Sequence, residues 1–291
     1  METTFLSPTS MLKYEDCGHQ YYLTNVLKIR TAQVGHALPF GKAGHKACLA
    51  YIKAHAEGNE NLDPVPIFQN AWKHALATEV IEFSRYTADE LMAIGSNLVK
   101  AFPEAWAATG WRALTNTNGA LVEARMRVTV GDGVILSGEA DMLIEDKDGR
   151  IGVPDLKFPA AKAFEGFAMI SDQLTAYNIL VNAHLASLGI AKKVEWLGFL
   201  EGLKKKSVEW THQISPARSE VQMEAYLRKL AFLAQSIRSG QFHKRSAAAF
   251  NSPCSLCDMR RLCLSSEAEG LVLSDDAKNA LGLVPFLQRV A

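Results

Sequence analysis

The sequence predicts an α/β fold in which helices flank both sides of a central mixed sheet. Apolar residues recur at helical spacing in segments 41–52, 65–106 and 171–188, whereas residues 121–130 alternate between apolar and polar side chains as a half-buried strand does. The chain has 291 residues, of which 48% are hydrophobic and 21% charged, so it can bury a sizeable core. We expect a single domain over residues 1–291.

The charge balance excludes a strongly basic nucleic-acid-binding protein. Lys and Arg together number 31, as do Asp and Glu, so the net charge is zero and any DNA contact must be confined to a local groove. No run of about 18 apolar residues and no signal-peptide pattern are present, so we expect an intracellular, cytoplasmic protein with no membrane segment. Because the sequence has no G-x-x-x-x-G-K-[ST] motif, we expect no ATP hydrolysis.

The first predicted elements are two helices. Ser7 and Pro8 give a capped start to a short helix that ends at Cys17, which places this cysteine at an element boundary. The helix over residues 41–52 carries His45 and Cys48. A lone histidine or cysteine on a partly apolar face is more often packed in the core than bound to a ligand, and we assign Cys48 to the core.

A helical insert is predicted at about residues 60–118. The polar segment 58–64 precedes it, and Thr87 and Glu90 have the spacing of a capping box inside the helical pattern that extends to about residue 106. The chain then changes to strands. Residues 121–130 form one of them, and a hairpin follows in which segments 141–145 and 151–157 are joined by the Asp148 and Gly149 turn.

The hairpin gathers two carboxylates and one ammonium group. Asp155 and Lys157 lie on the same side of their strand, near its exposed end, and Asp141 on the partner strand can lie close to them. Carboxylates are good ligands for Mg²⁺ or Mn²⁺, and a nearby lysine can orient water or stabilise negative charge, which suits phosphodiester hydrolysis. Solvated hairpin ends also carry such charges, and the D-x-K triplet occurs by chance in many proteins. The hairpin alone therefore does not distinguish a metal-binding site from an ordinary solvated hairpin end.

After the hairpin, the pattern predicts a helix at 171–188 that presents Gln173 and Tyr177 on one face. Strands at 194–203 and 207–214 follow, and they flank a turn of three lysines that is usually just solvated. The next predicted element is a long amphipathic helix, opened by the pair at positions 215–216 and closed by a glycine at 240.

The five cysteines favour a metal centre. Cys254, Cys257 and Cys263 have the spacing C-x2-C-x5-C in a segment expected to be a loop, and Cys17 is the natural fourth ligand from the other end of the chain. An odd number of cysteines in a reducing compartment favours metal binding over disulfides. Four thiolates suit either zinc or an iron–sulfur cluster, and the ligand type alone does not distinguish the two.

The order of these motifs resembles the RecB-like branch of the PD-(D/E)XK nuclease superfamily. Within that branch the chain is most similar to the iron–sulfur exonucleases, which include a CRISPR-associated RecB-like nuclease and the nuclease domain of the AddB helicase subunit. The resemblance covers almost the whole chain. It rests on Gly41-x3-His45, Glu123, Gly138-x2-Asp141, Pro154-Asp155-Leu156-Lys157, Gln173-x3-Tyr177, and the cysteines Cys17, Cys254, Cys257 and Cys263.

The resemblance implies a restriction-endonuclease-like core and an iron–sulfur module built from residues 1–30 and 245–270. The implied activity is Mg²⁺- or Mn²⁺-dependent cleavage of DNA, with an exonuclease acting on single-stranded ends as the favoured form. Partner proteins of a recombination, DNA repair, CRISPR or phage system are implied as well. The alternative is a non-cleaving DNA-binding or assembly subunit that keeps the nuclease fold.

The resemblance also implies roles for the motif residues. His45, Asp141 and Asp155 are expected to hold the metal ion, with the backbone carbonyl of Leu156 as a further ligand. Lys157 is expected to position the attacking water or to neutralise the transition state.

Three further residues and the cysteines complete the implied set. Glu123 is expected to bind a second ion or to orient the metal ligands. Gln173 and Tyr177 are expected to contact the DNA backbone or a base face. The cysteines Cys17, Cys254, Cys257 and Cys263 are expected to bind a 4Fe-4S cluster.

Overall fold

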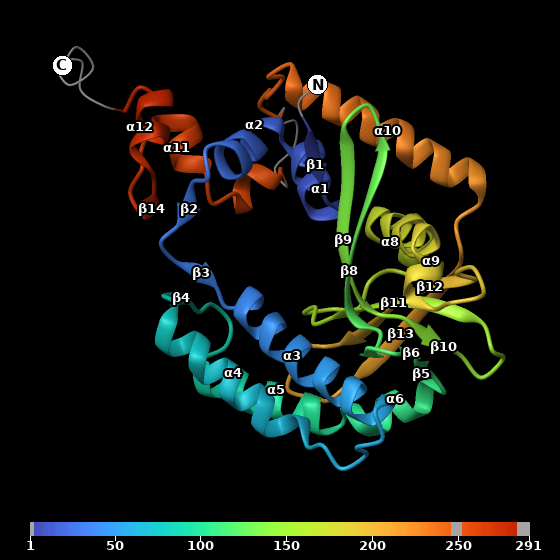
Figure 1. The fold of residues 1–291 in the computed structure, drawn as a ribbon. Helices are drawn as coiled ribbons and strands as arrows, with labels where there is room; N and C mark the ends of the chain where they lie inside the picture. Colours follow the sequence, from blue (N-terminus) through green and yellow to red (C-terminus); the bar gives the residue numbers. More distant parts are fainter. Residues whose placement is uncertain (1–2, 246–251, 284–291) are drawn as a thin grey trace.

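The computed structural model describes residues 3–245 and 252–283. Residues 246–251, which belong to the predicted iron–sulfur module, lie outside the described residues, as do 1–2 and 284–291. The strands are β1 (Thr4–Leu6), β2 (Arg30–Thr31), β3 (Val34–Gly35), β4 (Ile81–Glu82), β5 (Arg112–Ala113), β6 (Thr115–Asn116), β7 (Gly119–Ala120), β8 (Val122–Gly131), β9 (Val134–Met142), β10 (Ile144–Glu145), β11 (Ile151–Lys157), β12 (Trp196–Gly202), β13 (Trp210–Pro216) and β14 (Leu271–Val272) (Figure 1).

The helices account for much of the remaining described chain. They are α1 (Pro8–Asp16), α2 (Gly18–Tyr21), the π-helix η1 (Tyr22–Val26), α3 (Ala37–Ala56), α4 (Pro64–Thr78), α5 (Ala88–Lys100), α6 (Phe102–Thr109), α7 (Phe167–Ile170), α8 (Asp172–Ala183), α9 (Leu185–Leu188), α10 (Glu220–Arg238), the 3-10 helix η2 (Pro253–Leu256), α11 (Arg260–Ser265) and α12 (Asp275–Ala280). None of the described helices combines the length and the apolar character that crossing a membrane requires.

The predicted α/β class is confirmed, and the sheet is divided in two. Five strands form a mixed sheet in the order β13-β12-β11-β10-β5, in which β11 and β12 are parallel and the other pairs are antiparallel. Three strands form a second sheet in the order β1-β9-β8, in which β1 runs parallel to β9. The chain therefore passes from one sheet to the other where β9 is followed by β10.

The predicted hairpin is present but short. Its ladder consists of the pairs Ile144–Gly152 and Glu145–Ile151, and Gly149 has the positive φ that the turn requires. Asp141 does not belong to the hairpin, contrary to the prediction, because it lies in β9 and that strand pairs with β8. Alternation in the sequence shows that a strand exists but does not identify its partner.

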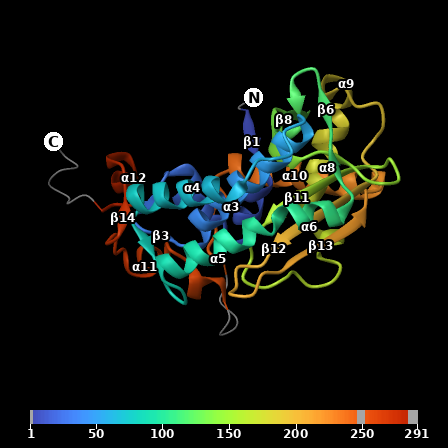
Figure 2. The same ribbon diagram turned by 90° about the horizontal axis from the view of Figure 1, so that it is seen from below.

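Two apolar cores cover the two faces of the main sheet. Helices α3 to α6 pack on one face, where their core includes Phe40, Phe68, Leu91, Leu156 and Leu200. Helices α8 and α10 pack on the other, where the core includes Val153, Leu174, Leu180, Phe199 and Leu230. In Figure 1 the two helical layers lie below and above the strands, and Figure 2 views the molecule from the side of α3 to α6. The helical segment after residue 60 therefore shares its core with the sheet.

The two ends of the described chain pack together away from the main sheet. Strand β2 pairs with β14, and a small apolar cluster joins Leu23 and Ile29 to Met259, Leu262 and Ala277. Both views show β14, α11 and α12 at one end of the molecule, and Figure 1 shows β2 beside them (Figures 1 and 2). Long-range contacts thus bring the segments that carry the outlying cysteines into one region.

Helix boundaries follow the capping residues. The capping boxes of Ser7 with Ser10 and of Thr87 with Glu90 are both present, as predicted for these two helix starts. The predicted start of the long helix at positions 215–216 is wrong, because α10 begins after Ser219, which forms a capping box with Gln222. The serine and proline at 215–216 end the edge strand β13, where proline is tolerated.

Helix α3 approaches the end of β11 most closely at a glycine. A Cβ atom added at Gly44 would lie 2.5 Å from the ring of Phe158, whereas one added at Gly41 would meet nothing within 4 Å. The side chain next to Gly44 is His45, so this close contact sets the distance of the histidine from the sheet. The contact requires glycine at 44, whereas the open space at 41 accepts alanine.

We expect Gly44→Ala to destabilise the protein and Gly41→Ala to stabilise it. Alanine is favoured over glycine inside a helix by about 1 kcal/mol, which the open position gains. At position 44, overpacking against Phe158 costs about 1–3 kcal/mol and outweighs that gain. Thermal unfolding of both variants measures the difference, and equal stabilisation by the two substitutions would contradict the close approach.

Candidate active site

The candidate site forms where β9 and β11 pack against each other without a backbone ladder. There the Leu156 amide donates to Oδ2 of Asp141 at 2.7 Å, so a side chain replaces the missing backbone acceptor. Because Leu156 lies between Asp155 and Lys157 in β11, this bond brings the Asp141 carboxylate to both of them. The structure thus joins three residues that the sequence places in one motif set.

Asp155 is buried, with only 1% of its surface exposed, and not at an exposed strand end as predicted. The reason is that β11 is the central strand of five and both of its faces are covered by helices. Gln173 donates to Oδ1 at 2.9 Å, and the Lys157 ammonium lies 2.7 Å from Oδ2. The geometry of the lysine contact is not that of a hydrogen bond, so buried Oδ2 has a nearby cation but no donor.

The two carboxylates share one small volume. Burial, and then the negative charge of Asp155, raise the pKa of Asp141 well above its ordinary value. The hydrogen bond from Leu156 and the charge of Lys157 oppose the rise. A site that raises a carboxyl pKa in this way favours a bound proton or a bound cation.

His45 completes the cluster from α3. Its Nδ1 lies 3.5 Å from Oδ2 of Asp141, and its ring centroid lies 5.7 Å from that of Phe158. Burial lowers the pKa of His45, and the charge of Asp155 only partly offsets this. A hydrogen bond between the ring and the backbone of Leu156 also raises the pKa of His45, because it favours the protonated ring. The histidine is therefore held mainly neutral, which is the form that binds metals.

Glu123 lies at the solvent side of the cluster. It falls between the paired residues Val122–Met142 and Ala124–Ala140, and so beside Asp141 on the neighbouring strand, but it is not itself paired. Its φ of 54° is in the left-handed region, a costly conformation for a residue with a side chain. The Glu123 charge adds a smaller contribution to the raised pKa of Asp141. The break in pairing thus leaves an exposed carboxylate beside the half-buried Asp141.

Gln173 and Tyr177 lie behind Asp155. The Gln173 amide donates both to Asp155 and to the Tyr177 hydroxyl, each at 2.9 Å. Tyr177 is 6% exposed, and burial raises its pKa. Both side chains are thus arranged to orient the carboxylate of Asp155, and the DNA contacts expected of them stay a prediction.

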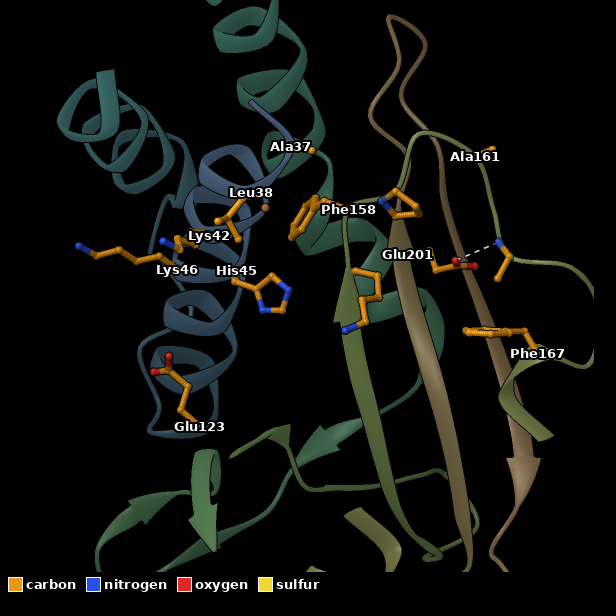
Figure 3. A pocket seen from close by; sticks show the side chains of 14 residues that line it. Ala37, Leu38, Lys42, His45, Lys46, Glu123, Phe158, Ala161, Phe167 and Glu201 are labelled. Atoms are coloured by element: carbon orange, nitrogen blue, oxygen red, sulfur yellow. Dashed lines mark hydrogen bonds between the residues drawn. The ribbon is translucent and has the colours of Figure 1, made fainter. Parts of the chain in front are cut away.

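A pocket of about 910 Å³ lies in front of the cluster. His45, Glu123 and Lys157 line one part, and Figure 3 shows His45 on α3 facing the wall that carries Phe158 and Glu201. Three charged lining residues were not singled out from the sequence: Lys42, Lys46 and Glu201. A signal existed for each of them. The two lysines are three residues before and one residue after His45, and Glu201 is an acid inside a largely apolar predicted strand.

The acidic cluster fits a magnesium-like ion with few protein ligands. Nowhere in residues 3–245 and 252–283 do three or more His, Cys, Asp or Glu side chains form a group that could hold a metal ion. Mg²⁺ is commonly held by only one or two carboxylates and keeps several waters or phosphate oxygens. Asp141 and Asp155 provide two carboxylates, and Oδ2 of Asp155 has no hydrogen-bond donor. This donor set is compatible with such an ion.

The outlying cysteines are all free thiols. Cys17 lies between α1 and α2, as the sequence predicts. Burial raises the pKa of Cys257, and the charges of Cys17, Asp258 and Cys254 add a smaller contribution. Among the described residues these cysteines are not gathered into a group of three or more metal ligands. Cys254 and Cys263 lie in η2 and α11, so the segment is not the loop expected.

Cys48 is separate from these cysteines. It is fully buried in the core beneath α3, and burial raises its pKa well above the ordinary value. The prediction that it is a core residue is confirmed.

Comparisons with known proteins identify a family. A family model described as "PD-(D/E)XK nuclease superfamily" matches residues 5–264. No curated protein matches the chain significantly. Two solved structures are similar in part. One is described as "Putative exonuclease" from Eubacterium rectale, with 13% identity, a TM-score of 0.48, and coverage of 88% of this chain and 87% of that chain. The other is SSO0001, with 14% identity, a TM-score of 0.32, and coverage of 89% and 96%. Both TM-scores are too low to carry an argument.

We expect Asp141→Asn to stabilise the metal-free protein at neutral pH. The raised pKa means that the Asp141 carboxylate, once ionised, works against folding, and each pKa unit corresponds to about 1.4 kcal/mol. Asparagine keeps an acceptor for Leu156 without the charge. The advantage should shrink as the pH falls through the raised pKa, because the wild-type group then binds its proton.

Thermal unfolding in a chelator across a range of pH measures this effect. With Mn²⁺ added, the wild type should gain stability and Asp141→Asn should gain much less, since a ligand stabilises only the state that binds it. A variant that is less stable than the wild type in chelator at neutral pH would contradict the assignment.

Proposed function

The chain belongs to the PD-(D/E)XK nuclease superfamily, and we propose that it is a Mg²⁺- or Mn²⁺-dependent deoxyribonuclease that hydrolyses phosphodiester bonds, acting as an exonuclease at single-stranded DNA ends. The observation that carries the proposal is the convergence of Asp141, Asp155, Lys157 and His45 beside one open pocket. A non-cleaving subunit would have no use for a buried and a half-buried carboxylate that repel each other next to a lysine.

The acids and the histidine are the proposed metal ligands. Asp141, Asp155 and His45 would hold the ion, with the backbone carbonyl of Leu156 as a further oxygen. When bound, the ion supplies polarisation of the phosphate and a bound water of lowered pKa. Glu123 at the solvent side would orient these ligands or hold a second ion.

Other residues of the chain act on charge and orientation. The Lys157 side chain is 40% exposed. Its ammonium group can therefore reach a phosphate in the pocket and stabilise the negative charge that develops there. Gln173 fixes one oxygen of Asp155 through its amide, and Tyr177 supports that amide. This bond leaves the other Asp155 oxygen facing Lys157.

The pocket walls support a single-stranded substrate. Phe158 and Phe167 supply aromatic rings, and aromatic rings stack on bases of any identity. Lys42 and Lys46 lie on the helix across the pocket, and no ion pair of either lysine is found in the described part of the chain. A neutral protein can bind a DNA backbone through such a local pair of cations.

We also propose that Cys17, Cys254, Cys257 and Cys263 bind one 4Fe-4S cluster. The spacing of the last three cysteines, and the apolar cluster of the two chain ends against which Cys257 packs, support this. When bound, the cluster would cross-link the two ends, so part of its binding free energy would stabilise the fold. Partner proteins of a recombination, repair, CRISPR or phage system, and an intracellular site of action, stay predictions from the resemblance.

We expect Asp155→Asn and Lys157→Met each to reduce cleavage by about 100-fold or more, the size of effect seen when one key electrostatic group is removed. Asparagine replaces the buried Asp155 without changing its shape. End-labelled single-stranded and duplex DNA with Mg²⁺ or Mn²⁺ gives the rates. Asp148→Asn and Lys147→Met, exposed at the far end of the same hairpin, are matched controls and should cleave normally. Wild-type rates in either site variant would refute the site.

We expect Cys17→Ala to remove bound iron and inorganic sulfide and to lower stability. Cys48→Ala, the matched control in the core, should lower stability by cavity formation but keep the iron. Iron and sulfide analysis of the anaerobically purified protein, together with the visible absorbance of the iron–sulfur cluster, measures the outcome. Full iron content in Cys17→Ala, or zinc in place of iron in the wild type, rules the proposal out.

A further inference from the structure

Glu201 is a buried acid in the wall of the pocket that no step of the proposed reaction uses. It lies on β12, is only 3% exposed, and lines the pocket together with Ala163 and Phe167. Its Oε1 accepts a hydrogen bond from the Ala163 amide at 3.1 Å, which Figure 3 shows. Its Oε2 is also buried and has no hydrogen-bond partner among the residues that the structure describes.

No cation of the described chain neutralises this carboxylate. Lys157 is its direct neighbour across the β11–β12 ladder, but the Lys157 ammonium is engaged with Asp155 at 2.7 Å. A buried carboxylate oxygen without a donor is costly, because its hydration is lost and not replaced. The free oxygen therefore fits a ligand that brings its own N–H or O–H group.

The surroundings of Glu201 fit a flat, apolar ligand. Phe167 stacks on Phe199 with centroids 5.4 Å apart and so presents a fixed ring. Phe158 lines the same pocket, and Leu38 on α3 lies across it with 55% of its surface exposed. Nucleobases have this combination of apolar faces and hydrogen-bonding edges.

The opposite charges of the two pocket walls favour one orientation of a bound nucleotide. The cations Lys42 and Lys46 lie on the α3 wall, and Glu201 lies on the sheet wall. Phosphate is attracted to the first wall and repelled by the second. A nucleotide in the pocket would therefore place its backbone toward α3 and its base toward Glu201.

We propose that the pocket holds one unpaired nucleobase of the substrate strand and that Oε2 of Glu201 accepts a hydrogen bond from the amino group of that base. This inference rests on the proposed nuclease function and deepens it. Adenine, cytosine and guanine carry amino groups, whereas uracil and thymine offer only a ring N–H flanked by two carbonyl oxygens, which a carboxylate repels. Glu201 thus makes the site selective for amino-bearing bases, and a base in a duplex cannot enter the pocket because it is stacked between its neighbours.

The test is binding of short oligo-dC and oligo-dU, whose bases differ in the amino group and the adjoining ring proton. Fluorescence anisotropy in chelator, at fixed salt and slightly alkaline pH, separates binding from cleavage. We expect the wild type to bind oligo-dC roughly five- to tenfold more tightly than oligo-dU. Glu201→Gln should abolish this ratio. In this variant the side-chain oxygen can still accept the hydrogen bond from the Ala163 amide, while the glutamine NH2 group, a donor, replaces Oε2. Glu165→Gln is the matched control. Glu165 is exposed on the loop that carries Ala163, so this variant should keep the ratio.

A second variant addresses the pocket without touching the acid. Leu38→Ala removes an exposed wall residue, so its fold should be kept even where Glu201→Gln does not fold. It should weaken binding of both oligomers and leave binding of an abasic strand unchanged. Equal affinity of the wild type for oligo-dC and oligo-dU, or an unchanged ratio in Glu201→Gln, overturns the proposal.

The two proposals fail in different ways. Equal cleavage of the two oligomers by the wild type, with equal binding, refutes the base pocket and leaves the nuclease function standing. An oligo-dC preference that depends on Glu201, in a protein that cleaves nothing with either metal, refutes the nuclease function alone. Lack of binding to either strand refutes both.

Discussion

The site depends on one hydrogen bond, from the Leu156 amide to the Asp141 carboxylate. It joins two strands that have no backbone ladder between them, and it does so at the point where the two sheets diverge. A backbone acceptor in that position would have satisfied the amide equally well but would have brought no charge. Because the acceptor is a carboxylate, the same bond that links the sheets also places an acid beside Asp155.

The arrangement is costly for the folded chain and is supported by its surroundings. The buried Asp155 and the half-buried Asp141 carboxylates repel each other, which adds to the effect of burial on the pKa of Asp141, and Glu123 nearby has a strained backbone. The apolar cores on both faces of the main sheet supply the stability that permits this cost. Functional sites commonly keep such unfavourable charge when a ligand is to relieve it.

Much of the fold and of the candidate site could be predicted from the sequence, because hydrophobic periodicity reveals the helices and strands on which the motif residues lie. The burial of these residues could not be predicted. Asp155 has a sequence neighbourhood like that of an exposed hairpin end, and only the helical layers over β11 explain why it is 1% exposed. The inward contact of Gln173 likewise depends on the position of α8 over β11. Glu201 becomes notable only when its missing partner is known, and a missing partner is a three-dimensional fact.

The pairing of the two chain ends has a consequence for synthesis. Leu23 and Ile29 leave the ribosome early, but the residues that cover them, among them Met259 and Leu262, are among the last of the described chain to be made. The sheets and their helices can therefore form while this region still has no core of its own. During that interval two apolar side chains stay uncovered, so the nascent protein is open to chaperones and to aggregation at this end long after its sheets have folded.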